Sequence, residues 1–251
     1  MIELYGMSSP NVAKVTILLE ELELPYETRH VDVFRGPGRI GAIAAHSPFG
    51  KVPVIIDRRA GDLAVFESGA ILTYLAERYG GEALLPPSGP DRYAVLQWLT
   101  AQVATVGPFL GQNNHFRLLP DEAGSYAARR YAEQSRHVFH VLDKRLAAAA
   151  YLAGDFYSIA DIATYPWAGY VPRQGLDWGD FPALKAWCDR IGERPAVVRA
   201  AKVQAAFGPQ DMAARQGASQ EDLDRFFWRD RPGPAADFDI YANPAPPADA
   251  R

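Results

Sequence analysis

The stretch FGKVPVIIDRRAGDLAVFESGAILTYLAERY, residues 49–79, decides the fold of this chain. Its β-branched run at 54–56 and its apolar run at 63–66 are separated by turn-type residues, which predicts a β-hairpin. The apolar positions that follow have helical spacing, and Ser68 is placed to be the N-cap of that helix. The stretch therefore predicts two antiparallel strands followed by a helix.

The same stretch indicates a binding site for a small peptide. Pro53 opens the first strand, and proline is tolerated at an edge strand, at a strand start or in a turn with a cis bond. An edge strand there would leave backbone groups open to an extended peptide, and the N-terminus of the following helix would bind a carboxylate. Glu67 adds a partner for an ammonium group, although Glu67 alone also fits a solvated loop acid and Ser68 a simple cap. We expect a ligand that carries an amine and a carboxylate at one end.

The segments before this stretch complete a small α/β domain. Residues 2–5 and 26–33 are predicted strands, and the helix between them begins at Pro10 with Ser9 as its cap. Strand, helix, strand, hairpin and helix in this order are the thioredoxin pattern. The fold class is α/β plus all-α: a thioredoxin-like domain over 1–82 is followed by a helical domain.

Helical periodicity dominates the rest of the chain. We place a linker at 83–90 and an all-helical domain at 91–207, which holds a long helix at 125–148 and the capping box Ser158–Asp161. The remaining 208–251 is an extension in which only a patch at 223–228 is amphipathic, and we expect it to wrap the surface or cover part of the site entrance.

Composition restricts the function classes. The chain has 251 residues and a net charge of −4, and this charge gives no reason to expect binding to nucleic acid or to an anionic membrane. No apolar run approaches the roughly 18–20 residues that span a bilayer, and the N-terminus does not read as a signal peptide, so we expect a cytoplasmic protein. The one cysteine, Cys188, rules out an intrachain disulfide, a redox pair and a thiolate metal site, and no metal is expected. Its position in AWCDRI favours a buried helix residue that is not a nucleophile.

The pair Val52-Pro53 followed by Glu67-Ser68 resembles the glutathione site of the glutathione transferases. More specifically, six ordered motifs spread over residues 1–205 are similar to the nu class, which is related to the fungal prion-type nitrogen regulator: SSPNVAKVTILLEEL, HSPFGKVPVI, FESGAILTYLAERYG, LGQNNHF, HVLDKRL and YSIADIATYPW. The resemblance implies a homodimeric glutathione-dependent disulfide-bond reductase, whose site holds glutathione in reduced form or as the oxidised dimer.

The resemblance also assigns roles to individual residues. It places Asn11 and Ser9 at the glutathione sulfur as the catalytic pair, and it implies a cis bond between Val52 and Pro53. The residues that it implies for glutathione binding are Lys51, Val52, Pro53, Glu67, Ser68, Arg130 from the neighbouring subunit, and Gln112 and Asn113 facing the cleft between domains. Gly38 stands where members often have Gln, and Arg39 is our expected substitute. From the sequence alone Asn11 also fits an early helix residue, and Arg130 a solvated helix charge.

A protein without a reactive thiol must activate the thiol of its ligand. Free thiols titrate near pH 8.5, so lowering the pKa below neutrality takes about 2–3 kcal/mol. A helix N-terminus supplies roughly 0.3–1 kcal/mol, up to about 2 when partly buried. Hydrogen-bond donors must supply the rest, and Ser8, Ser9 and Asn11 at the start of the first helix are the candidates. Tyr5 is expected to point into the core and not to serve as a catalytic phenol.

The function that we predict is glutathione-dependent reduction of a small disulfide, or of an organic peroxide. Two alternatives stay open at this point. One is a ligand-binding regulatory protein, which is weakened by the lack of an Asn/Gln-rich tail. The other is conjugation of glutathione to an electrophile, which would differ only in the acceptor pocket.

Overall fold

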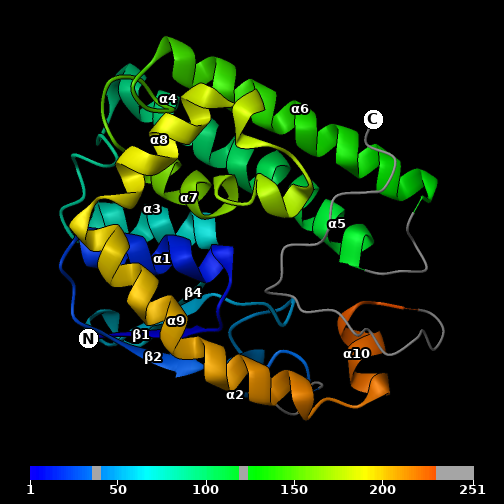
Figure 1. The fold of residues 1–251 in the computed structure, drawn as a ribbon. Helices are drawn as coiled ribbons and strands as arrows, with labels where there is room; N and C mark the ends of the chain where they lie inside the picture. The colour runs from blue at the N-terminus through cyan, green and yellow to red at the C-terminus, as the bar shows by residue number, and fades with distance from the viewer. Residues whose placement is uncertain (36–40, 119–123, 230–251) are drawn as a thin grey trace. The chain divides into compact units, whose positions relative to one another are not determined.

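A four-stranded sheet in the order β2-β1-β3-β4 forms the centre of the N-terminal part of the molecule. The strands are β1 (Ile2–Gly6), β2 (Tyr26–His30), β3 (Val54–Asp57) and β4 (Leu63–Phe66). β1 pairs in parallel with β2 and antiparallel with β3, and β3 pairs antiparallel with β4 across a loop that holds the 3-10 turn η1 (Arg58–Ala60). The thioredoxin-like pattern is confirmed (Figure 1).

This computed structural model describes residues 1–35, 41–118 and 124–229. Its contacts divide the chain into two units. The first contains Met1–Gly81 and the segment that begins at Arg194, and the second contains Glu82–Glu193. Residues 195–207, which the sequence analysis assigned to the helical domain, therefore belong with the thioredoxin-like sheet.

The position of β3 corrects one expectation. Ile55 lies opposite Leu4 of β1 on one side and opposite Val65 of β4 on the other, so β3 is an interior strand. The prediction of an edge strand after Pro53 is wrong, because the hairpin adds β4 outside it. Any backbone groups offered to a ligand must come from Val52, which precedes the strand.

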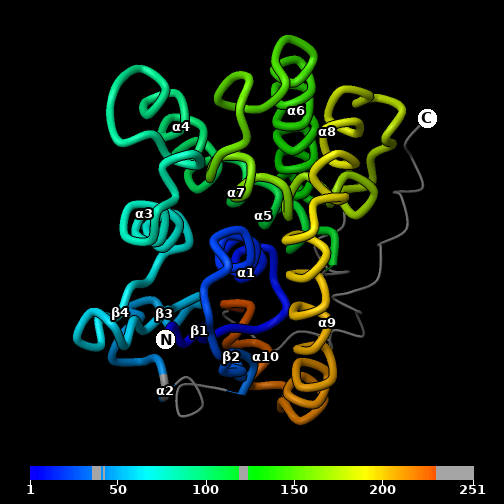
Figure 2. The backbone as a smooth tube through the Cα atoms, turned by 90° about the vertical axis from the view of Figure 1, so that its left-hand side faces the viewer, coloured from blue at the N-terminus to red at the C-terminus, as the bar shows by residue number. Residues whose placement is uncertain are grey.

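Helices cover both faces of this sheet. α1 (Pro10–Glu21) and α3 (Ser68–Arg78) lie on the same side (Figure 2), and on the other the short α2 (Gly41–Ala44) packs Ile43 against Val31 and Val54. α1 begins as predicted, because the Ser9 hydroxyl oxygen accepts a hydrogen bond from the Val12 amide at 3.3 Å.

The start of α3 differs from the prediction. Its N-cap is Glu67, with φ of 67° and no side-chain capping bond, and Ser68 is the first helical residue. The hydroxyl of Ser68 is buried and accepts a hydrogen bond from Nζ of Lys14 instead. The assignment of Ser68 as the cap is therefore wrong, because a buried side chain of α1 occupies its oxygen.

The chain returns to the first unit through two further helices, α9 (Pro195–Gln216) and α10 (Gln220–Phe226). α9 packs along α1 and is joined to it by ion pairs from Arg194 to Glu21 and from Arg199 to Glu20, each 2.6 Å long. Helical structure continues past residue 208, with Pro209 inside α9, so the segment 208–216 has the regular structure that we did not expect of it. α10 overlaps the predicted amphipathic patch, whereas 230–251 lie outside the described residues.

The second unit is helical, as predicted. Its elements are α4 (Gly89–Ala101), the π-helical turn η2 (Gln102–Val106), α5 (Gly107–Leu118), α6 (Tyr126–Ala148), α7 (Ile159–Ala168), the 3-10 turns η4 (Pro172–Gln174) and η5 (Trp178–Asp180), and α8 (Pro182–Gly192). The predicted capping box is present: the Ser158 amide donates to the Asp161 carboxylate at 3.0 Å. That carboxylate also accepts from Trp187 of α8 at 3.1 Å, so the cap joins two helices.

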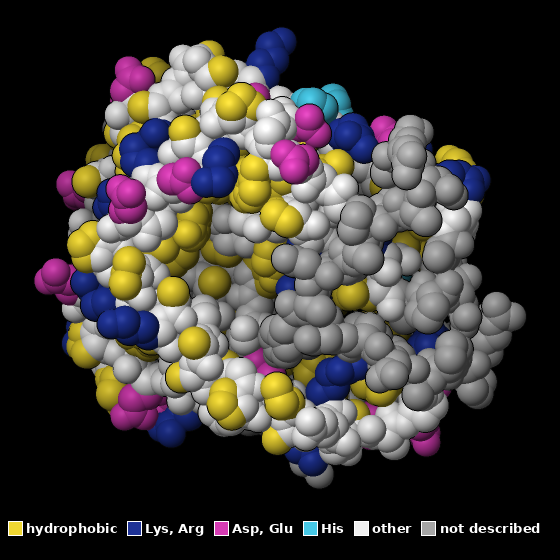
Figure 3. Space-filling view, viewed as in Figure 1, with side chains coloured by type: hydrophobic (Ala, Val, Ile, Leu, Met, Phe, Trp, Pro, Cys, Tyr) yellow, Lys and Arg dark blue, Asp and Glu magenta, His cyan; other side chains and the backbone are white. Residues whose placement is uncertain are grey.

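Acidic and basic side chains are interspersed over the face drawn in Figure 3, as the small net charge suggests. Among the described residues, no helix is long and apolar enough to cross a membrane. Nor do these residues contain a group of three His, Cys, Asp or Glu side chains that could hold a metal ion.

Candidate functional site

A cavity of about 450 Å³ opens at the N-terminal end of α1, within the first unit. Its volume lies within the range of about 300–1,000 Å³ that is typical of small-molecule sites. It is lined from four segments: Met7, Ser9 and Asn11; Val33 and Phe34; Phe49, Gly50, Lys51 and Val52; and Asp222, Arg225, Phe226 and Trp228. Four residues predicted for the glutathione site, Ser9, Asn11, Lys51 and Val52, are thus brought together.

Ser9 and Asn11 stand where α1 begins. The Ser9 oxygen accepts from the Val12 amide, which leaves the hydroxyl proton able to donate toward the cavity. Asn11 occupies the first turn, and its side-chain amide carries two N–H donors. Both therefore add hydrogen-bond donors to the positive end of a helix dipole, an arrangement that stabilises an anion.

The loop that carries Ser9 is held from α9. The Ser8 amide donates to the carboxylate of Asp211 at 2.9 Å, and the Ser9 amide to the side chain of Gln204 at 3.4 Å. Asp211 is buried and also contacts the His30 ring at 2.8 Å. Sequence reasoning missed both α9 residues, because nothing local links positions 204 and 211 to the first loop of the sheet.

The loop before β3 is fixed by one serine. The Ser47 hydroxyl donates to the Lys51 carbonyl at 2.8 Å and accepts from the Lys51 amide at 2.9 Å. The Val52–Pro53 peptide that follows is cis, as the resemblance implied. The side chain of Lys51 is exposed and able to pair with a carboxylate.

Glu67 and Ser68 lie at the start of α3. Glu67 is an exposed non-glycine residue in a sparsely populated backbone conformation, with φ of 67° and ψ of 118°, and such residues concentrate at functional sites. Lys14, 1% exposed, donates to the Ser68 hydroxyl at 3.2 Å. Burial lowers the pKa of Lys14 to about 7, although the nearby Glu67 carboxylate opposes the shift. Because the ammonium occupies the oxygen of Ser68, the hydroxyl proton must point elsewhere.

The other predicted binding residues belong to the helical unit or lie outside the described residues. Asn113 is buried inside the helical unit, where its amide donates to Gln174 at 2.7 Å, and Gln112 is exposed on the same helix. Arg130 is exposed and lines a second hollow, of about 390 Å³, on the helical unit. Arg39 lies outside the described residues.

Neither Tyr5 nor Cys188 is placed to act as a catalytic phenol or thiol. The Tyr5 hydroxyl donates to the Glu3 carboxylate at 3.1 Å, and burial raises the pKa of Tyr5. Cys188 is buried in α8, where burial raises the pKa of its thiol to about 12. A thiol of that kind is inert as a nucleophile near neutral pH.

The sequence matches two family descriptions, "Glutathione S-transferase, N-terminal domain" over residues 4–83 and "Glutathione S-transferase, C-terminal domain" over 106–195. It is also 43% identical to the disulfide-bond oxidoreductase YfcG of Escherichia coli over 204 residues, which cover 80% of this chain and 94% of that protein. The chain belongs to the glutathione S-transferase family. The predicted likeness to the nu-class disulfide-bond oxidoreductases is confirmed.

Solved structures of family members are similar to this chain. A glutathione transferase family member from Pseudomonas fluorescens, with two glutathione bound, superposes with a TM-score of 0.70 at 36% identity, covering 79% of this chain and 91% of that one. The yeast prion protein Ure2p, in complex with glutathione, superposes with a TM-score of 0.74 at 32% identity, covering 79% and 93%.

One wall of the cavity lies outside the part that the family descriptions match. α10 and Trp228 follow residue 195, where the second description ends, yet they line the same cavity as Ser9 and Asn11. The sequence analysis expected the extension to cover part of the site entrance, and α10 stands beside the predicted catalytic pair.

Proposed function

We propose that this transferase is a glutathione-dependent disulfide-bond reductase in which the sulfur of glutathione is the nucleophile. The observation that carries the proposal is the pairing of Ser9 and Asn11 at the N-terminus of α1, inside a cavity, in a protein whose one thiol is buried with a raised pKa. The arrangement is suited to activating a thiol that the ligand brings.

The binding mode follows from the two helix starts. The γ-glutamyl end of glutathione, with its amine and carboxylate, would lie against Glu67 and the N-terminus of α3, where the Ser68 hydroxyl proton is directed away from Lys14. The backbone of Val52 would pair with the cysteinyl part, and Lys51 with the glycyl carboxylate. Solved relatives with glutathione bound support glutathione as the ligand.

Ser9 and Asn11 would then set the charge on the sulfur. Lowering the thiol pKa from about 8.5 to below neutrality takes about 2–3 kcal/mol. The helix N-terminus accounts for at most about 2 of these, and hydrogen bonds to a charged acceptor, worth roughly 1.5–3 kcal/mol each, make up the difference. The helix N-terminus alone is thus insufficient, and at least one of the two side chains must donate to the sulfur.

The chemistry is two successive thiol–disulfide exchanges. The glutathione thiolate attacks one sulfur of the substrate disulfide, the bond between the two substrate sulfurs breaks, and the leaving thiolate takes a proton from solvent. A second glutathione thiolate then attacks the mixed disulfide at the glutathione sulfur and releases the second substrate thiol. Two glutathiones lose two electrons and become oxidised glutathione, while one disulfide becomes two thiols. An organic peroxide would be reduced in the same position: the thiolate attacks the outer oxygen, the O–O bond breaks and the alcohol leaves, and a second glutathione condenses with the resulting sulfenic acid to give oxidised glutathione and water.

We also propose that the enzyme acts as a homodimer in which Arg130 reaches the glutathione site of the neighbouring subunit. The support is its exposed position on α6, beside Phe109, Glu133 and His137 in the second hollow, together with the family resemblance. A cationic side chain there would pair with a carboxylate of the tripeptide.

The decisive assay measures reduction of a small disulfide at fixed glutathione, with oxidised glutathione recycled by a coupled reductase. We expect turnover in the wild type and in Cys188→Ala, and a loss of about tenfold or more in Asn11→Ala, because one charge-assisted bond to the sulfur is worth roughly 1.5–3 kcal/mol. Loss of activity in Cys188→Ala, in a protein that still folds, would contradict the proposal.

A regulatory ligand-binding role is the second candidate, favoured by the likeness to the nitrogen regulation fragment of Ure2p. This role would use the same glutathione-binding site but would involve no catalytic turnover. Glutathione binding measured by calorimetry, with no reduction of any disulfide by the wild type, would support this role over catalysis.

A further inference from the structure

We propose that α10 forms the acceptor half of the site and selects uncharged disulfides that carry an aromatic ring. The inference rests on the proposed function and names the class of substrate that the same site takes.

α10 faces the predicted catalytic pair across one cavity. Ser9 and Asn11 line it from α1, and Asp222, Arg225, Phe226 and Trp228 line it from the C-terminal segment. A group bonded to the attacked sulfur must lie next to the donors of Ser9 and Asn11, and this places it against α10.

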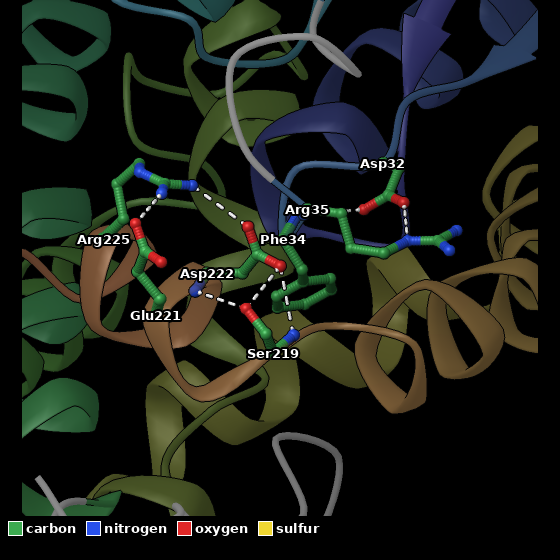
Figure 4. Close-up of polar contacts among 7 residues, drawn as sticks. All are labelled: Asp32, Phe34, Arg35, Ser219, Glu221, Asp222 and Arg225. Carbon is green, nitrogen blue, oxygen red and sulfur yellow. Dashed lines mark hydrogen bonds and ion pairs between the residues drawn. The ribbon is translucent and has the colours of Figure 1, made fainter. Parts of the chain in front are cut away.

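The helix is held in place by packing of aromatic rings. The ring of Phe226 packs against that of Phe34, with centroids 4.8 Å apart and planes tilted by 48°. Phe34 is in turn fixed by Asp32, whose carboxylate accepts from the Phe34 and Arg35 amides, each at 3.1 Å, and pairs with the Arg35 side chain (Figure 4). The wall is therefore anchored to the loop that follows β2.

The polar groups of α10 are paired among themselves. Ser219 and Asp222 form a capping box. The Ser219 amide donates to the Asp222 carboxylate at 3.0 Å, and the Asp222 amide donates to the Ser219 hydroxyl oxygen at 3.1 Å. Arg225 donates to the carboxylates of Asp222 and Glu221 at 3.0 Å each (Figure 4). Because its charge is already compensated, Arg225 offers little to an anionic acceptor, and this favours an uncharged one.

Apart from the buried Phe34, the aromatic side chains that line the cavity are exposed. Phe49 is 71% exposed, Phe226 36% and Trp228 91%, and all three line the cavity, with Met7 and Val33 adding apolar surface. Aromatic rings attract one another in offset and edge-to-face arrangements beyond the gain from burial. An acceptor with an aromatic ring would cover these surfaces, whereas a small aliphatic acceptor would leave them in water.

The test compares two unreactive analogues, S-methylglutathione and S-benzylglutathione, by titration calorimetry. In the wild type we expect the benzyl compound to bind more tightly. In Trp228→Ala, which removes a cavity-lining ring that is 91% exposed, this advantage should shrink about two- to tenfold while the affinity for the methyl compound stays as in the wild type, because the ring contact with the benzyl group is lost. Tyr93→Ala, at an exposed tyrosine of the helical unit, is the matched control and should behave as the wild type.

Turnover gives an independent measurement. The ratio of kcat/KM for a diaryl disulfide to that for bis(hydroxyethyl) disulfide should fall by the same factor in Trp228→Ala, with thermal unfolding unchanged. An unchanged ratio in both experiments would overturn the role of α10 and leave the proposed function standing. If the wild type bound neither analogue, the proposed function itself would fail.

Discussion

At the scale of single residues, Lys14 is the most informative side chain that the sequence did not single out. It lies within the apolar pattern of α1, and only the fold shows that its ammonium is buried against the Ser68 hydroxyl and near Glu67. A charged group is costly to bury unless it is paired. We therefore interpret Lys14 as a residue that positions the start of α3, and not as a core residue.

The lowered pKa of Lys14 predicts how the free energy of unfolding depends on pH. The unfolded chain keeps the Lys14 proton up to its ordinary pKa of 10.5, whereas the folded chain releases it near pH 7. Between these values the unfolded state binds more protons, so the free energy of unfolding should rise with pH, in total by a few kcal/mol. Below pH 7 the cost of burying the charge is fully present.

Urea unfolding of the wild type and of Lys14→Met at pH 7 and pH 10 checks this. We expect the wild type to gain stability relative to the variant as the pH rises through this window. Parallel profiles for the two proteins would show that the lysine stays charged in the fold.

At the scale of elements, α9 determines the geometry of the loop that carries Ser9. Asp211→Ala would leave the Ser8 amide and the His30 ring without a buried partner, and an unsatisfied buried group costs about 1–3 kcal/mol. We expect a stability loss of this size and, in the folded fraction, a higher KM for glutathione. Asp211→Asn keeps an acceptor oxygen and should lose less of both. Equal loss in the two variants would argue against the positioning role.

The cap of α7 is a contrasting case, because it belongs to the helical unit, whereas all residues that line the cavity belong to the first unit. Ser158→Ala should destabilise the protein by about 0.5–2 kcal/mol, the usual worth of a helix cap. We expect kcat and KM per folded molecule to be unchanged, as measured by thermal unfolding and by the disulfide assay at low temperature. A change in KM would mean that this cap influences the site.

These elements also show how far the sequence was informative. Local signals predicted the strands, the Ser9 cap and the capping box at Ser158, because each depends on neighbours in the chain. The interior position of β3, the bond from Lys14 to Ser68 and the contact of Asp211 with the first loop depend on distant pairing, which periodicity does not report. The candidate site was predicted in part, since Ser9, Asn11, Lys51 and Val52 share the cavity, while the wall formed by α10 was foreseen only as a possible cover.

At the scale of the whole molecule, the proposed homodimer gives a further prediction. Arg130→Ala should leave the dimer intact in analytical ultracentrifugation and weaken glutathione binding about threefold or more, because a partly desolvated ion pair is lost. Arg136→Ala, at a neighbouring position of α6, is the control. A monomeric wild type, or unchanged affinity in Arg130→Ala, would contradict the shared site.

The central claim concerns the protonation state of the sulfur of bound glutathione. Ultraviolet absorbance of the thiolate during a titration with glutathione measures this state directly. The account predicts that bound glutathione is largely a thiolate at neutral pH in the wild type and in Cys188→Ala, and that Asn11→Ala binds it mostly as the thiol. Binding without a thiolate signal in the wild type, or the same signal in Asn11→Ala, would contradict the account.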